Sequence, residues 1–210
     1  MIVAIDGPAG AGKSTVARML AERIGFRYLD TGAMYRALTW LAIKEGLDLG
    51  DGEKLGVLAR EHPVELDRSG RVSIAGADVT TSIRTARIDK MVPVVARHPR
   101  VREVMRERQR RLAERSDSVM EGRDIGTVVA PNADVKVYLV ADAETRAARR
   151  RAERPEVGDA ALDTDPLRRD RQDAERMTPA DDAIRIDTTH LRVEDVVDEI
   201  EALVRSRQPV

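Results

Sequence analysis

The sequence predicts an α/β fold with a five-stranded parallel sheet and helices on both of its faces. Strand-like apolar runs alternate with segments of helical periodicity. The first run, 1–6, is apolar on both faces, as buried parallel strands are. A glycine-rich turn then joins this run to a helical segment. The predicted strands are 1–6, 26–30, 118–121, 135–140 and 183–186.

Helices are predicted between and after these strands, where apolar residues recur at helical spacing. Gly25 is placed to close the first helix as its C-terminal cap, and the second helix breaks near Gly46. Pro99 is a favourable first residue for the long amphipathic helix that follows the middle of the chain. The predicted helices begin at or just after Lys13, Asp30, Pro99, Asp142 and Val193.

A small antiparallel insert is predicted in the middle of the chain. Short alternating segments at 64–66, 71–74 and 77–79 are separated by Ser69-Gly70 and by Gly76, which favour turns. The chain is expected to form a single domain. Its predicted parts are a core of 1–61 and 99–210 and an insert of about 62–98.

The composition indicates a globular protein. Hydrophobic residues make up 42% of the 210 residues and charged residues 35%. No apolar stretch approaches the roughly 20 residues of a membrane helix. The sequence has no cysteine, which excludes disulfides and thiolate metal sites and fits a reducing cytoplasm.

The charge pattern argues against a general nucleic-acid binder. The net charge is −1 and the aromatic content only 2%, whereas such binders use excess positive charge or stacking on aromatic rings. Arginine supplies 31 of the 36 basic residues. Because arginine binds phosphate oxygens in a forked geometry, these side chains are candidates for phosphate recognition.

Residues 7–14 match the phosphate-loop pattern of Gly, four residues, then Gly-Lys-Ser, between the first predicted strand and helix. The glycines let backbone N–H groups turn toward phosphate oxygens, and the helix N-terminus adds its positive end. Lys13 is expected to bridge the β- and γ-phosphates of ATP, and Ser14 to ligate Mg²⁺. The residues expected to bind ATP are Gly7, Pro8, Ala9, Gly10, Ala11, Gly12, Lys13, Ser14 and Thr15.

A phosphate loop by itself occurs in kinases, GTPases, motor ATPases and nucleotide sensors. A GTPase should show an Asn-Lys-x-Asp motif for guanine, and the sequence has none. Instead, residues 30–36 read DTGAMYR and residues 122–127 read GRDIGT, each directly after a predicted strand. Both segments should open at the edge of the sheet where an α/β fold gathers its ligands.

These segments resemble bacterial-type cytidylate kinases, a family of P-loop nucleoside monophosphate kinases. The resemblance also includes the insert and runs in order over nearly the whole chain. The further matching segments are the phosphate loop, 99–103, 169–176, 182–183 and 186–189. Two features depart from the family pattern: Pro93 stands near a position where the family usually has a serine on the base, and the loop at 177–181 is shortened.

The resemblance implies a P-loop NTPase-type fold that transfers the γ-phosphate of ATP to CMP or dCMP, giving CDP or dCDP and ADP. It implies ATP as co-substrate and Mg²⁺ as cofactor. It makes the insert at about 62–98 the part that binds the acceptor nucleotide, and it implies a short lid at about 149–168. We expect a cytoplasmic monomer whose partners are CMP, dCMP and ATP, without nucleic acid or membrane.

The resemblance also implies roles for single residues. Lys13, Arg123 and Arg176 are the implied catalytic residues, and Arg36 joins the two arginines on the acceptor phosphate. The implied acceptor-binding residues are Thr31, Arg36, Arg102, Arg123, Asp124, Arg169, Asp173 and Arg176. Within this set, Arg169 and Asp173 contact the ribose.

Arg102 and Asp124 are implied to read cytosine. A carboxylate can accept a hydrogen bond from the exocyclic amino group of cytosine, which uracil lacks. Arg149 is implied to contact ATP. Glu121 is implied to support the Mg²⁺ site without being a direct ligand.

Two alternatives stay open at this point. The first is another small-acceptor P-loop kinase, acting on UMP, AMP, dTMP or a sugar acid. The second is a nucleotide-dependent RNA-binding or regulatory protein that uses residues 97–115. This segment contains eight arginines and only three glutamates. The apolar stripe of the same segment favours a solvated amphipathic helix instead.

Overall fold

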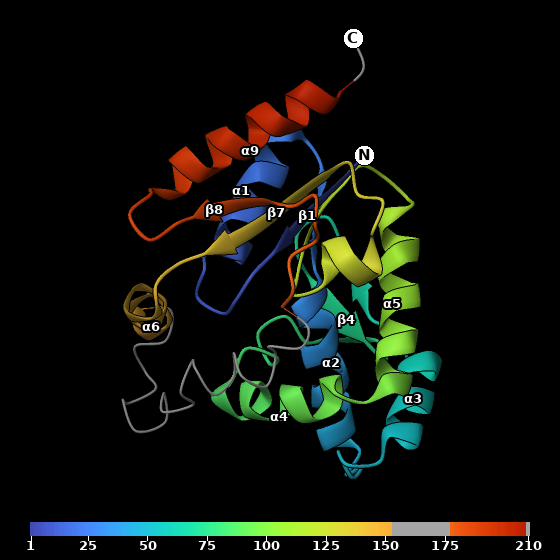
Figure 1. Cartoon of the computed structure of the whole chain (residues 1–210). Coiled ribbons are helices and arrows are strands. Elements are labelled where there is room, and N and C mark those ends of the chain that lie inside the picture. Colours follow the sequence, from blue (N-terminus) through green and yellow to red (C-terminus); the bar gives the residue numbers. More distant parts are fainter. Residues whose placement is uncertain (153–176, 209–210) are drawn as a thin grey trace. The chain divides into compact units, whose positions relative to one another are not determined.

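The computed structural model describes residues 1–152 and 177–208 (Figure 1). The chain forms two compact units. The first comprises Met1–Tyr28 and Ser116–Val210, and the second comprises Leu29–Arg115. The expected boundaries of the insert stay a prediction, and the expected lid lies mostly outside the described residues.

The first unit is built on a five-stranded parallel sheet in the order β2-β6-β1-β7-β8. All five predicted strands form. Their bounds are β1 (Ile2–Asp6), β2 (Arg27–Asp30), β6 (Ser118–Glu121), β7 (Val135–Val140) and β8 (Ile184–Asp187). The central strand β1 pairs with β6 so that Ile5 lies opposite Glu121, and with β7 so that Asp6 lies opposite Tyr138. The carboxyl end of β1 therefore lies between the carboxyl-terminal halves of β6 and β7.

Side chains on the two faces of β1 alternate between two environments. Val3 and Ile5 belong to an apolar core with α1 (Lys13–Ile24) and α9 (Val193–Arg207), which pack against each other. The next residues, Ala4 and Asp6, point to the opposite face, as the period of two requires. There η1 (Ile125–Val129), a π-helical turn, packs against β1.

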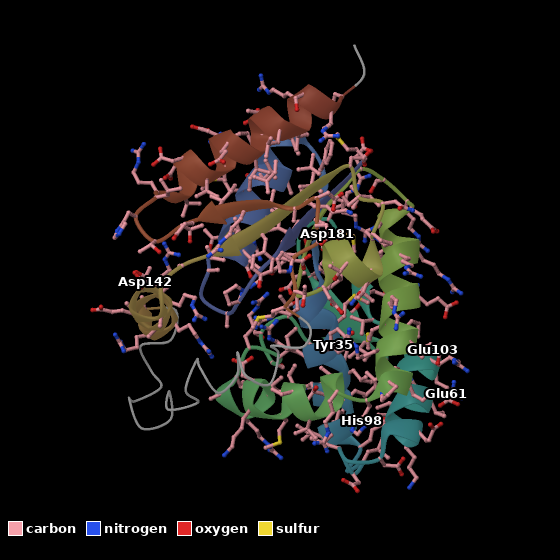
Figure 2. All side chains as sticks on the ribbon, viewed as in Figure 1. Tyr35, Glu61, His98, Glu103, Asp142 and Asp181 are labelled. Carbon is pink, nitrogen blue, oxygen red and sulfur yellow. The ribbon has the colours of Figure 1, made fainter. Side chains whose placement is uncertain are left out.

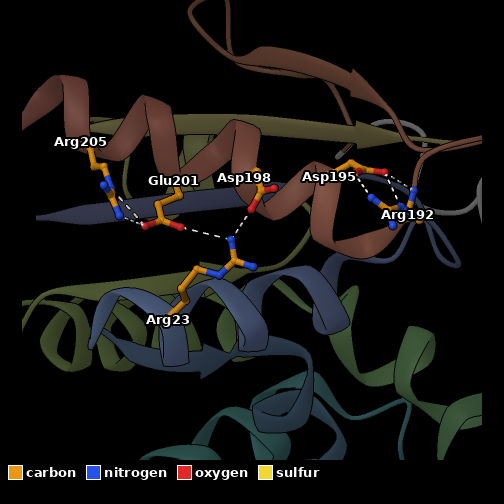
Figure 3. A network of polar contacts seen from close by, with 6 residues as sticks. All are labelled: Arg23, Arg192, Asp195, Asp198, Glu201 and Arg205. Carbon is orange, nitrogen blue, oxygen red and sulfur yellow. Dashed lines mark hydrogen bonds and ion pairs between the residues drawn. The ribbon is translucent and has the colours of Figure 1, made fainter.

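Polar contacts also join α1 to α9 at the surface (Figure 3). Arg23 of α1 pairs with Asp198 and with Glu201, the second at 3.3 Å, and Arg205 pairs with Glu201 from within α9. Solvent screens such exposed ion pairs, so the buried aliphatic side chains supply most of the stability of this helix pair.

Helix α6 (Ala143–Ala152) of the first unit begins as the sequence predicts. Asp142 precedes it (Figure 2), and its carboxylate accepts a hydrogen bond from the Thr145 backbone N–H at 2.6 Å. This contact satisfies one of the N–H groups that every helix leaves unpaired at its start.

The second unit contains four helices and the predicted antiparallel insert. The helices are α2 (Thr31–Lys44), α3 (Gly52–Glu61), α4 (Ala86–Ala96) and α5 (Pro99–Ala113). The insert is a three-stranded sheet of β3 (Glu65–Leu66), β4 (Val72–Ile74) and β5 (Ala77–Asp78). Asp30 caps α2 by accepting from the Ala33 N–H at 2.8 Å, as predicted.

Two helices of the second unit have no counterpart among the predicted elements. Asp51 caps α3, and Thr85 caps α4, which continues through Pro93. His98 lies just before α5 (Figure 2), where its Nε2 is 2.8 Å from the Leu49 carbonyl oxygen. Gly52 and Gly56 lower the helix propensity of α3, and Pro93 lowers that of α4. Both helices therefore depend on tertiary packing, which the sequence pattern does not reveal.

Gly56 lies where α3 approaches α5 closely. A Cβ atom added there would be 2.9 Å from the Cβ atom of Arg100, which is too short for ordinary contact.

We expect Gly56→Ala to lower the free energy of unfolding by about 1–3 kcal/mol, because overpacking outweighs the gain in helix propensity. Urea denaturation measures the change. Val57→Ala, at an exposed position of the same helix, is the control and should change it by less than about 0.5 kcal/mol. An equal effect of both substitutions would contradict the close approach.

Candidate active site

The phosphate loop lies between β1 and α1, and its backbone requires glycine. Gly7, Gly10 and Gly12 have φ angles of 142°, 78° and 87°, which other residues rarely adopt. A Cβ atom on Gly7 would also lie 2.1 Å from the Leu139 carbonyl oxygen, and one on Gly10 would lie 2.7 Å from the Arg146 carbonyl oxygen. Any side chain at either position would therefore displace the loop.

Contacts from α6 and from the end of β8 hold the loop from outside. The guanidinium of Arg146 is buried and donates to the Ala9 carbonyl oxygen at 3.3 Å. Thr188 is also buried, and its hydroxyl lies 3.1 Å from the Ala11 carbonyl oxygen. Arg149 donates to this hydroxyl at 2.9 Å and to the Thr188 carbonyl oxygen at 2.6 Å. The sequence predicts neither the loop contact of Arg146 nor that of Thr188, and the contact of Arg149 with ATP stays a prediction.

Lys13 lies near the end of the phosphate loop, and its side chain points back into the loop. Its ammonium group donates to the Pro8 carbonyl oxygen at 2.7 Å, and the residue is only 8% exposed. Among the described residues, no side chain caps the N-terminus of α1 at Gly12. The lysine and the backbone N–H groups of the first helical turn therefore concentrate positive charge at one point, as an anion site requires.

Ser14, Glu121 and Tyr28 form a hydrogen-bonded group beside the loop. The Ser14 hydroxyl donates to Glu121 Oε1 at 2.6 Å, and the Tyr28 hydroxyl donates to the same oxygen at 3.0 Å. Hydroxyl and carboxylate oxygens are the protein ligands that Mg²⁺ accepts. The described residues contain no cluster of three or more His, Cys, Asp or Glu that could hold a metal ion. In phosphoryl-transfer sites, Mg²⁺ usually takes most of its ligands from substrate phosphates and water.

Arg123 and Asp124 follow β6 at the same edge of the sheet. The guanidinium of Arg123 donates to the Gly7 carbonyl oxygen at 3.3 Å and approaches the sulfur of Met177 at 3.4 Å. Asp124 directly precedes η1, and its carbonyl oxygen accepts from the N–H groups of Val128 and Val129. The first unit thus brings the phosphate loop together with the predicted segment 122–127.

Asp6, for which the sequence predicts no role, is buried beneath this segment. Its two carboxylate oxygens accept from the backbone N–H groups of Ile125 at 2.8 Å and Gly126 at 2.7 Å. Burial raises the pKa of Asp6 to about 6; the charge of Asp124 acts in the same direction, while the two N–H groups and Lys13 oppose it. Only the position of Asp6, directly before Gly7, hinted at a role in the sequence.

Predicted acceptor residues also occur in the second unit. Thr31 is buried at the start of α2. One turn further on, the guanidinium of Arg36 lies 3.8 Å from Asp30 and 3.2 Å from Asp89. Arg102 lies half-buried on α5. The predicted residues Arg169, Asp173 and Arg176 lie outside the described residues.

Comparison with known proteins identifies the family. The family model described as cytidylate kinase matches residues 3–206. A cytidylate kinase of Geobacillus kaustophilus (strain HTA426) is 49% identical, and one of Geobacillus sp. (strain WCH70) is 47% identical. Each alignment covers 98% of this chain and 96% of the relative.

Solved structures show the same fold at low sequence identity. A gluconokinase from Sinorhizobium meliloti 1021 superposes with a TM-score of 0.50 at 16% identity, over 98% of this chain and 92% of that one. Within the described part of the chain, no helix combines the length and the apolar character needed to cross a membrane. The match along residues 3–206 and the two near-full-length relatives show that this chain belongs to the cytidylate kinase family.

Proposed function

We propose that this chain transfers the γ-phosphate of ATP to CMP or dCMP and so forms CDP or dCDP together with ADP. The carrying observation is the cytidylate kinase match over residues 3–206, which covers every segment of the site. The phosphate loop at the end of β1 supports the use of ATP as donor, because three glycines with positive φ shape it to bind phosphate oxygens.

On the donor side, the chain holds the triphosphate of ATP by charge and geometry. The N–H groups at the start of α1 face phosphate oxygens, and Lys13 neutralises charge between the β- and γ-phosphates. Ser14 is the proposed residue that would hold Mg²⁺ directly, and the ion would supply positive charge to the phosphates there. Glu121 orients Ser14 through their 2.6 Å hydrogen bond.

On the acceptor side, arginines bind the nucleotide monophosphate. Arg36, Arg123 and Arg176 are the proposed ligands of its phosphate, because guanidinium groups match phosphate oxygens in pairs. The acceptor phosphate is already an anion, so the reaction needs little help from a general base. The ribose contacts are proposed for Arg169 and Asp173, and Thr31 completes the acceptor set.

The cytosine contacts are proposed for Arg102 and Asp124. A carboxylate at the base accepts a hydrogen bond from the exocyclic amino group of cytosine. With uracil, the carboxylate would face a carbonyl oxygen, and because both groups are acceptors they cannot form a hydrogen bond. The same residue can therefore both favour CMP and reject UMP.

We propose a cytoplasmic monomer that acts on free nucleotides and not on nucleic acid. The net charge of −1 supports the last point. On helix α5, Arg100 and Arg111 already pair with Glu103 and Glu107, which supports a solvated helix over an RNA-binding surface.

An acceptor panel tests the proposed activity. With ATP and Mg²⁺, we expect kcat/KM for CMP and dCMP to exceed that for AMP and dTMP by at least about 10²-fold, because the base-reading groups stay unpaired with other bases. ADP release in a coupled assay measures each rate. A higher kcat/KM for another acceptor would overturn the assignment, and so would salt-sensitive RNA binding without phosphorylation of any nucleotide.

A further inference from the structure

We propose that Asp6 is a positioning residue for the acceptor nucleotide: its buried carboxylate holds the segment that carries Arg123 and Asp124 against the end of the phosphate loop. The inference rests on the proposed function, because it assumes that Arg123 and Asp124 bind the acceptor. It adds a residue to which neither the sequence motif nor the reaction chemistry assigns a role.

The contact geometry is specific. Oδ1 of Asp6 accepts from the Ile125 N–H at 2.8 Å, and Oδ2 accepts from the Gly126 N–H at 2.7 Å. These are the first two residues of η1, whose N–H groups have no partner within a helical turn. A carboxylate from a distant strand therefore caps the turn with both of its oxygens, and Asp6 is only 7% exposed.

Neighbouring contacts make this cap the centre of a short clamp. Gly122 donates its N–H to the Ile5 carbonyl oxygen at 3.0 Å, and Arg123 donates to the Gly7 carbonyl oxygen at 3.3 Å. Residues 5, 6 and 7 thus each bind one part of segment 122–126. Asp6 lies directly before Gly7 in the chain and binds Ile125 and Gly126, the two residues that follow Asp124. A shift of its carboxylate would therefore move Asp124 relative to the phosphate loop.

The charge of Asp6 is unfavourable for stability, which argues that the contact serves positioning. Its pKa is raised from 3.8 to about 6, so the folded chain binds a proton more readily than the unfolded chain. Ionisation of Asp6 consequently lowers the free energy of unfolding as pH rises through this range. Buried groups with such shifted pKa values concentrate at functional sites.

The ionised form is the one that can hold both N–H groups. Above pH 6 the carboxylate has two accepting oxygens, whereas protonation turns one of them into a donor that faces an N–H group. The charged groups around Asp6 are Asp124 at the start of η1 and Lys13 at the start of α1. The side chain of Lys136, on β7, borders Gly126 from the other side.

The central experiment compares Asp6→Asn with Asp134→Asn. In the control, Asp134 Oδ2 also accepts from a backbone N–H, that of Ile2 at 2.7 Å, but at the opposite end of β1. We expect Asp6→Asn to raise KM for CMP about tenfold and to change KM for ATP less than threefold, because misplaced binding groups cost one to two orders of magnitude. Asp134→Asn should change neither constant more than twofold. Intact mass must be checked, because asparagine before Gly7 can deamidate back to aspartate.

A pH series adds a readout that a merely structural role would not move. The phosphate of CMP itself titrates near pH 6, but it does so equally for both enzymes. The ratio of kcat/KM for wild type to that for Asp6→Asn therefore isolates the enzyme. We expect this ratio to fall toward 1 between pH 8 and pH 5. A ratio that stays constant would overturn the proposal.

Two further measurements keep the test decisive if Asp6→Asn does not fold. In wild type, the amide proton resonances of Ile125 and Gly126 should titrate together near pH 6 by NMR. Gly126→Ala adds a Cβ atom 3.4 Å from Asp6 Oδ2 and 3.3 Å from Lys136 Cδ, and should raise KM for CMP more than KM for ATP. The role of Asp6 would be refuted if the Ile125 and Gly126 amide protons did not titrate. It would also be refuted if KM for CMP were unchanged in Asp6→Asn or, should that variant not fold, in Gly126→Ala. A wild type that does not phosphorylate CMP would refute the proposed function instead, while the amide titration would still report the contact.

Discussion

Replacing Lys13 with methionine is expected to lower kcat for phosphoryl transfer by about 10³-fold, equal to about 4 kcal/mol of transition-state stabilisation. The reason is that charge spreads over the transferred phosphoryl group, and Lys13 is the residue whose ammonium lies inside the phosphate loop. Methionine keeps the length and apolar stem of the side chain, so the loop should retain its packing. Initial rates at saturating ATP and CMP measure the loss.

Lys44→Met is the matched control for this substitution. Lys44 lies in the last turn of α2, with its ammonium 5.0 Å from the centre of the Trp40 ring. Its loss should change kcat less than twofold, and the thermal unfolding midpoints of both variants should remain within a few degrees of wild type. Turnover that survives Lys13→Met at the wild-type rate would contradict the role of residues 7–14 in catalysis.

Most strands and the phosphate loop could be predicted because their signals are local. The run 118–121 was predicted with the same bounds that β6 has, and Gly25 closes α1 with φ of 73°. Asp30 and Asp142 cap their helices through hydrogen bonds that span only three residues. In each case the side chain and its partner lie in one short segment, so propensity and tertiary structure agree.

The elements that escaped prediction depend on contacts between distant segments. Helix α3 contains two glycines that disfavour a helix, yet Gly56 allows the close approach to Arg100 of α5. Turn η1 consists largely of β-branched residues and is capped by Asp6, about 120 residues away in the chain. Neither the packing of Gly56 nor the cap of η1 leaves a periodic pattern in the sequence.

The candidate site divides in the same way. Residues 7–14 form a continuous motif whose geometry follows from its glycines, so its role could be read directly. The contacts of Arg146 and Thr188 with the outside of the loop could not, because each reaches a backbone carbonyl across more than 100 residues. Backbone carbonyls are present at every position, and their partners therefore carry no sequence signature.

Substitution of Asp124 tests base recognition, and we expect Asp124→Ala to lower the ratio of kcat/KM for CMP to that for UMP by about 10²-fold or more. The backbone of Asp124 accepts hydrogen bonds from Val128 and Val129 at 2.9 and 3.2 Å, which do not depend on its side chain. The turn should therefore persist in the variant. Competition assays with CMP and UMP measure the ratio directly.

Asp124→Asn separates the effect of charge from that of hydrogen bonding. Its amide keeps an accepting oxygen for the amino group of cytosine and adds a donor for the O4 atom of uracil, so activity on UMP should rise while activity on CMP falls. Glu199→Ala, at an exposed position of α9, is the control and should leave the ratio unchanged. If both Asp124 variants keep the wild-type ratio, the cytosine is read by other residues. The clamp around Asp6 would then position Arg123 alone, and the effect of Asp6→Asn on KM should be the same for CMP and UMP.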